Sequence, residues 1–259
     1  MVDFSEAVKR PLQADRVTVL LGVLFSLVYP LRPLLHGFGL EVARGTQRRH
    51  YKMPRFDDFI DSYLSGLMVL VILIIYFLPS AFFLVAGALA SIPFLISAAT
   101  GMVYPNGVSI TSVFPAIAGG AFFGAVAVFF GLLAGIMAPV GIQLYAHSKN
   151  FGSAFEFGKI MKVVSRGEYW ITWVWLIAYM VVLVFVIGLL STPINLVTIL
   201  LWGIASYLWW VTAYTLFAET VSNSNVLSPK YSNGKKAVSH SPTIHKKTAR
   251  KKTKKRKKK

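Results

Sequence analysis

The chain has 259 residues, of which 55% are hydrophobic and only 14% are charged, and it contains no cysteine. Soluble domains usually carry about 25% charged residues, so the composition excludes an ordinary soluble protein, and the lack of cysteine excludes disulfides and thiolate metal sites. The net charge of +17 is concentrated after residue 229, where 14 of the 27 Lys and Arg residues lie.

The first apolar run, residues 17–43, is interrupted by Pro30 and Pro33 and also contains Arg32 and His36. Proline inside a helix breaks or kinks it, and each half, about 20 Å long or shorter, cannot cross roughly 30 Å of hydrocarbon. Basic residues on both sides of the run favour a re-entrant helical hairpin over a kinked fifth span. Arg32 and His36 are interpreted as interfacial anchors.

The next segment, MPRFDDFIDSYLSG at residues 53–66, contains a D-D-x-x-D pattern formed by Asp57, Asp58 and Asp61. Such spacing can hold magnesium for diphosphate chemistry, but that chemistry usually needs further converging carboxylates, and the chain has only ten acidic residues. The apolar residues of the segment instead recur at helical spacing on one face. We therefore expect an amphipathic helix at the membrane surface and no bound metal or cofactor, with the metal site as the alternative.

Four further runs are apolar and long enough to span a bilayer. They cover residues 67–90, 116–145, 169–190 and 196–218. The loops at 44–55 and 147–166 are rich in Lys and Arg, whereas the loops between paired spans are uncharged. The positive-inside rule then places both basic loops and the C-terminus in the cytoplasm of a cell-membrane protein, with the N-terminus also inside.

The second of these runs carries two G-x-x-x-G pairs on one helical face. Its glycines are Gly120, Gly124, Gly131 and Gly135. Small residues let helices approach closely, so we expect a packing face, either within the bundle or between copies in a homo-oligomer. A pore-lining role is the alternative.

The C-terminal tail after residue 220 is polar and basic and cannot bury enough apolar surface to fold alone. Residues 1–220 are therefore predicted to form the membrane domain, and 221–259 a disordered cytoplasmic tail. The tail is expected to bind anionic lipid headgroups, or else nucleic acid or the ribosome, without sequence specificity. The residues expected to do so are Lys246, Lys247, Arg250, Lys251, Lys252, Lys254, Lys255, Arg256, Lys257, Lys258 and Lys259.

Two stretches, GFGLEVARGTQRRHYKMPRFDDFIDSYLSG and NFGSAFEFGKIMKVVSRGEYW, resemble a family of uncharacterised multi-pass membrane proteins, mostly archaeal and bacterial. The resemblance covers residues 3–220 and includes a Pro-x-aromatic-Asp-Asp motif before a span. Phe56 stands where members often have Trp. The matching positions are Gly37, Gly39, Arg44, Pro54, Phe56, Asp57, Asp58, Gly66, Phe155 and Tyr169. The resemblance implies an architecture and no activity.

The sequence therefore predicts an all-α polytopic membrane helical bundle. It would have four spans, an N-terminal re-entrant hairpin or fifth span, and cytoplasmic interfacial amphipathic helices. No catalytic constellation is visible, so we expect a non-enzymatic membrane organiser or scaffold. The alternatives are a transporter or permease for an uncharged or lipid-like solute, and an enzyme acting on a lipid diphosphate.

Overall fold

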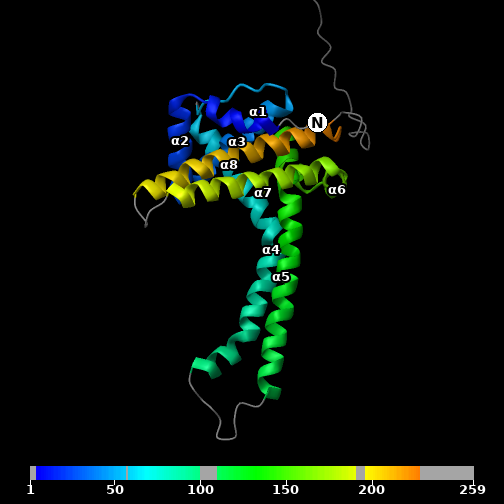
Figure 1. Cartoon of the computed structure of the whole chain (residues 1–259). Helices are drawn as coiled ribbons and strands as arrows, with labels where there is room; N and C mark the ends of the chain where they lie inside the picture. The colour runs from blue at the N-terminus through cyan, green and yellow to red at the C-terminus, as the bar shows by residue number, and fades with distance from the viewer. Residues whose placement is uncertain (1–3, 57, 100–109, 191–195, 228–259) are drawn as a thin grey trace, which may run out of the picture. The chain divides into compact units, whose positions relative to one another are not determined.

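The computed structural model describes residues 4–56, 58–99, 110–190 and 196–227, with side chains at 93–99 and 110–117 left out. The described residues form one compact unit. Every regular element in the described ranges is a helix, and the helices follow one another in pairs (Figure 1).

The first pair is short. After α1 (Phe4–Lys9) and the 3-10 turn η1 (Arg10–Gln13) come α2 (Arg16–Leu27), the turn η2 (Tyr29–Leu31) and α3 (Arg32–Gln47). The break falls at the prolines, as the sequence predicts. With 12 residues, α2 is about 18 Å long, too short to span. The two helices contact each other and α8, an arrangement that fits a hairpin better than a continuous fifth span.

The second pair consists of two long helices, α4 (Phe59–Ala99) and α5 (Ile110–Ser148), which run side by side (Figure 1). The pairing is antiparallel, because Gly87 of α4 lies against Phe123 whereas Ser80 donates a hydrogen bond to the Ala127 carbonyl oxygen at 2.8 Å. The expected surface helix at 53–66 is not separate: helix begins at Phe59 and continues directly into the span.

The third pair consists of α7 (Gly167–Leu190) and α8 (Leu196–Asn223), which also lie side by side (Figure 1). A short amphipathic helix, α6 (Phe157–Val164), precedes it; Ile160 and Val163 are buried, whereas Phe157 and Met161 are exposed.

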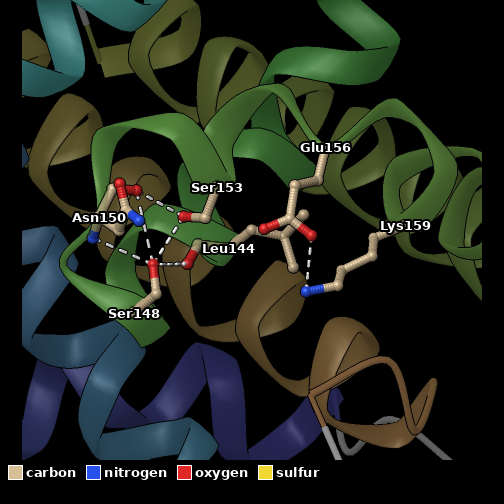
Figure 2. Close-up of polar contacts among 6 residues, drawn as sticks. All are labelled: Leu144, Ser148, Asn150, Ser153, Glu156 and Lys159. Atoms are coloured by element: carbon tan, nitrogen blue, oxygen red, sulfur yellow. Dashed lines mark hydrogen bonds and ion pairs between the residues drawn. The ribbon is translucent and has the colours of Figure 1, made fainter. Parts of the chain in front are cut away.

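The corner between α5 and α6 is held by a polar network around η3 (Phe151–Phe155) (Figure 2). The Ser148 and Ser153 hydroxyls lie 2.6 Å apart, and Ser153 also donates to the Asn150 carbonyl oxygen at 2.6 Å. Just beyond, Lys159 and Glu156 form an ion pair at 2.6 Å. These bonds satisfy the polar groups where α5 ends and let the chain turn sharply.

The tightest contact between helices joins α3 to α4. A Cβ at Gly37 would overlap the Ser62 carbonyl oxygen, and a Cβ at Gly66 would overlap the Pro33 carbonyl oxygen. Hence the small face of α4, formed by Ser62 and Gly66, packs inward, while its apolar residues such as Ile60 and Leu64 point outward. Backbone approach of this kind is typical of membrane bundles, where small residues line helix interfaces.

Four described helices are long and apolar enough to cross a membrane. They are Phe59–Ile92, Ala118–Ser148, Gly167–Leu190 and Leu196–Asn223. At most 28% of each apolar window is buried inside the protein, so most of its large apolar side chains face outward, which water would disfavour and lipid would not. The protein is therefore an all-α, multi-pass membrane bundle.

Candidate binding cavity between the helices

A cavity of about 330 Å³ lies where α3, α4, α5, α7 and α8 meet. This volume is at the lower end of the range for small-molecule sites, roughly 300–1,000 Å³. The walls are almost entirely apolar and aromatic. They are formed by His36, Leu73, Phe77, Gly135, Ala138, Pro139, Ile142, Gln143, Trp173, Trp209, Trp210, Ala213, Tyr214 and Phe217.

A histidine and a tyrosine supply polar atoms to this wall. The His36 Nδ1 atom and the Tyr214 hydroxyl oxygen are joined by a hydrogen bond of 3.1 Å. Gly39 makes this possible, because a Cβ there would overlap the Tyr214 ring. The Trp210 ring meets the His36 ring edge to face, with centroids 4.7 Å apart. Glycine on α3 and aromatic residues on α8 together fix the position of the imidazole.

Burial keeps that imidazole neutral. His36 is 6% exposed, and desolvation, aided by the positive charge of Arg32, lowers the pKa of His36 to about 4. The prediction that His36 anchors at the interface is therefore wrong, because its neighbours in the fold enclose it. Arg32 is exposed and lies over the Tyr29 ring, 4.8 Å from the centroid.

Gln143 lines the cavity and is hydrogen-bonded to Gln47. Gln143 is 2% exposed, and its Nε2 atom donates to the Tyr214 carbonyl oxygen at 3.4 Å. Gln47 donates to the Gln143 carbonyl oxygen at 3.1 Å. These contacts tie the ends of α3 and α5 to α8 and carry no charge.

Trp209 presents a hydrogen-bond donor without an acceptor. Its indole Nε1 is buried and has no partner among the described residues. Trp173, on the same wall, differs, because its Nε1 donates to the Tyr169 hydroxyl at 2.7 Å. Trp209 also lines a second cavity of about 210 Å³ between α7 and α8. An unpaired buried donor costs about 1–3 kcal/mol, so this N–H is suited to an incoming acceptor.

The acidic cluster predicted as a surface helix or a metal site lies apart from this cavity. Asp57 is outside the described residues. Asp58 and Asp61 are exposed, and the Asp61 N–H donates to the Asp58 Oδ1 atom at 3.1 Å. Within the described ranges no three His, Asp or Glu side chains gather as metal ligands would.

The four glycines of α5 divide into two kinds. Gly120 and Gly131 lie against Ser91 and Ser80 of α4. A Cβ at Gly124 or Gly135 would meet nothing within 4 Å, and Gly135 lines the first cavity. The tail lysines and arginines from Lys246 to Lys259 lie outside the described residues.

Sequence reasoning missed the cavity and its polar residues Gln143, Trp209 and Tyr214. The available signal was weak: Gln143 is a polar residue inside an otherwise apolar span, and such residues usually face the bundle interior. The small pair Ser62-x-x-x-Gly66 was a clearer missed signal for the contact with α3.

Fold and cavity together define an all-α integral membrane protein with a neutral, apolar site between its helices. The chain belongs to the family described as protein of unknown function (DUF4013), which matches residues 20–192. This match bears out the expected relationship to an uncharacterised domain and is silent on the Pro-x-aromatic-Asp-Asp motif, which stays a prediction. No curated protein and no solved structure matches the chain.

Proposed function

We propose that this protein is a non-enzymatic organiser of the cell membrane. Its basic loops and tail would lie in the cytoplasm, where the tail engages anionic lipid headgroups. The observation that carries this proposal is that the ends of several helices are tied together on one side of the bundle, and that this side is basic.

Three arginines make these ties by donating to backbone carbonyl oxygens. Arg44 Nε bonds Ala146 at 2.9 Å and so joins α3 to α5, and Arg166 Nη1 bonds Asn223 at 3.1 Å and so joins the start of α7 to the end of α8. Buried Arg10 donates to the His50 carbonyl oxygen at 3.3 Å and to the Thr46 hydroxyl. Burial lowers the pKa of Arg10 to about 10, but this value is still far above neutral pH, so the guanidinium stays charged.

Around these ties lie exposed basic side chains of the two loops that the positive-inside rule assigns to the cytoplasm. They are Arg48, Arg49, Lys52, Arg55, Lys149 and Lys162. The chain leaves α8 at Asn223 beside Arg166, so the tail begins at this basic side. Each Lys or Arg near an anionic surface contributes about 1 kcal/mol, and 14 of them follow residue 229.

The test uses the lack of cysteine, because a Ser241→Cys change gives one site for a fluorescent donor. The full chain is reconstituted in vesicles that carry an acceptor dye on either anionic or zwitterionic headgroups. We expect energy transfer to the anionic dye to exceed transfer to the zwitterionic dye at low salt. The excess should fall at high salt, since screening weakens the attraction. The matched control replaces the eleven Lys and Arg residues of 246–259 by Gln.

Equal transfer to both dyes in the full chain would refute lipid engagement by the tail. Ultraviolet crosslinking in cells then decides between the remaining roles. RNA or DNA recovered with the full chain but not with the Gln variant would make the tail a tether to nucleic acid.

A permease for an uncharged or lipid-like solute is the second candidate, and the cavity favours it. Transporter sites lie in cavities between helices near the middle of the membrane, and this cavity lies between helices that are candidate spans; Pro139 lines it, although α5 continues unbroken through this residue. In proteoliposomes, movement of a neutral fluorescent lipid from one leaflet to the other at a higher rate than in protein-free vesicles would support transport. A rate equal to protein-free vesicles would leave the cavity as a binding site.

A further inference from the structure

We propose that the two cavities beside Trp209 bind an uncharged, single-chain lipid, and that the Trp209 indole N–H donates to a carbonyl or ester oxygen of that lipid. The starting observation is the unpaired donor: Nε1 is buried and unpartnered among the described residues, yet Trp209 lines both cavities. In a low-dielectric interior an unpaired N–H is costly, and a ligand oxygen would remove that cost.

The shape of the site suits a chain. The cavities, about 330 Å³ and 210 Å³, share Trp209, so together they follow α8 from the α3–α5 side into the space between α7 and α8. Among the described residues, Trp209 is the one that lines both cavities, so an extended acyl chain that occupied both would pass the indole, with its oxygen-bearing carbon there. A compact solute would fill only one.

The chemistry of the walls selects against charge. Neither set of lining residues includes Asp, Glu, Lys or Arg, and the only ionisable groups on the walls are His36 and Tyr214. A charged headgroup inside would have no counter-ion and would pay the full cost of desolvation. A headgroup without charge, such as glycerol in ester linkage, avoids the cost of burying a charge, and only its hydroxyls need hydrogen-bond partners.

The bilayer itself can supply this ligand. Several residues around the second cavity are open to the outside of the bundle: Met180 is 51% exposed, Val184 41% and Trp202 49%. These side chains belong to spans whose outer surface faces lipid. A single-chain lipid can therefore enter sideways between α7 and α8 without passing through water.

The experiment uses the full chain in detergent and a monoacylglycerol that carries a photoreactive diazirine in its acyl chain. After illumination, crosslinked peptides are mapped by mass spectrometry while unlabelled monoacylglycerol competes. We expect saturable labelling on α7 and α8 near Ser206 and Trp209. An alkane of the same chain length should compete about fivefold less well, because it lacks the oxygen and one hydrogen bond is worth about 1 kcal/mol.

Two variants and two matched controls localise the site. Trp209→Phe keeps an aromatic ring but removes the N–H together with the rest of the pyrrole ring, and should raise the competitor concentration needed for half-displacement by about fivefold. Trp170→Phe, on the exposed side of α7, should leave it unchanged. Gly135→Leu fills the first cavity and should abolish saturable labelling, whereas Gly124→Leu, with equally open space beside its Cα but outside the cavity, should not.

Labelling that is spread over the exposed faces of α4 and α5, does not saturate, and is the same in all four variants would overturn the proposal and show only contact with bulk lipid. Saturable labelling on α7 and α8 that Trp209→Phe leaves unchanged would overturn the role of the indole N–H. The probe is uncharged and high salt can be used throughout, so the result is independent of whether the basic tail binds anionic headgroups.

Discussion

Replacing Gly66 by alanine should separate α3 from α4 and destabilise the protein. A Cβ at Gly66 would overlap the Pro33 carbonyl oxygen and crowd the Gly37 backbone nitrogen. Both obstacles are backbone atoms, so no side-chain rotation can relieve the overlap and the helices must shift. Overpacking in a tight contact typically costs about 1–3 kcal/mol. The gain in helix propensity from Gly to Ala, about 1 kcal/mol, offsets part of that cost.

The matched control is Gly124→Ala on α5, because a Cβ there meets nothing within 4 Å. It receives the same gain in propensity with no overlap. The two variants should therefore differ by about 1–3 kcal/mol, the overpacking cost alone. For a domain of this size 1 kcal/mol corresponds to about 2–4 °C in Tm, so Gly66→Ala should melt several degrees below Gly124→Ala.

The assay is thermal unfolding of the purified full chain in one detergent, followed by loss of a monodisperse peak in size-exclusion chromatography. Gly37→Ala should behave like Gly66→Ala, because its Cβ would overlap the Ser62 carbonyl oxygen. If both variants melt at or above Gly124→Ala, the close approach of α3 and α4 is refuted.

Three further changes test other parts of the bundle. The pKa of His36 is lowered from 6.5 to about 4, so the stability that the neutral imidazole contributes is fully present above pH 6.5 and is lost as the pH falls towards 4. Going from pH 7 to pH 5 should lower the free energy of unfolding by about 2 kcal/mol. The His36→Gln variant should show a weaker dependence of the melting temperature on pH. Tyr76→Phe removes the 2.6 Å hydrogen bond to the Ala154 carbonyl oxygen and should lower stability by about 1 kcal/mol, visible as a lower melting temperature than wild type. Asp61→Asn lies on an exposed face, so it should change the melting temperature little with or without magnesium; a magnesium-dependent rise that the variant abolishes would restore the metal-site interpretation.

The membrane class and the helix pairs were predictable because they depend on properties of single segments. Uncharged runs long enough to cross a bilayer identify spans in any context, and the break near Pro30 follows from the proline ring. Helix ends were less accurate. The span expected at 67–90 is part of α4 from Phe59 to Ala99, because the amphipathic segment before it has no residue that stops a helix.

The cavity was not predictable, because it depends on how five helices meet. Leu73, Ile142 and Phe217 have the same pattern as core residues elsewhere in the bundle, and nothing in their spacing distinguishes a wall from a packed contact. Nothing in the sequence distinguishes Trp209 from the other tryptophans of the membrane spans, because its unpaired N–H depends on its neighbours in the fold. The contact between α3 and α4 could have been predicted, since Gly37 and Gly66 both belong to the stretch that resembles the family.

The length of the α4–α5 pair has a consequence for how the protein lies in the bilayer. The part of α4 that is a candidate membrane span, Phe59–Ile92, has 34 residues and is about 51 Å long at 1.5 Å per residue, against roughly 30 Å of hydrocarbon. Even a tilt of 40°, the steep end of the observed range, leaves roughly 9 Å in excess. Serine and glycine contacts bind α4 to α5, so the two helices must share one tilt. The amphipathic first turns of α4, which carry exposed Asp61, can lie in the headgroup layer and take up most of this excess. The hairpin is therefore expected to be steeply tilted in a bilayer of ordinary thickness.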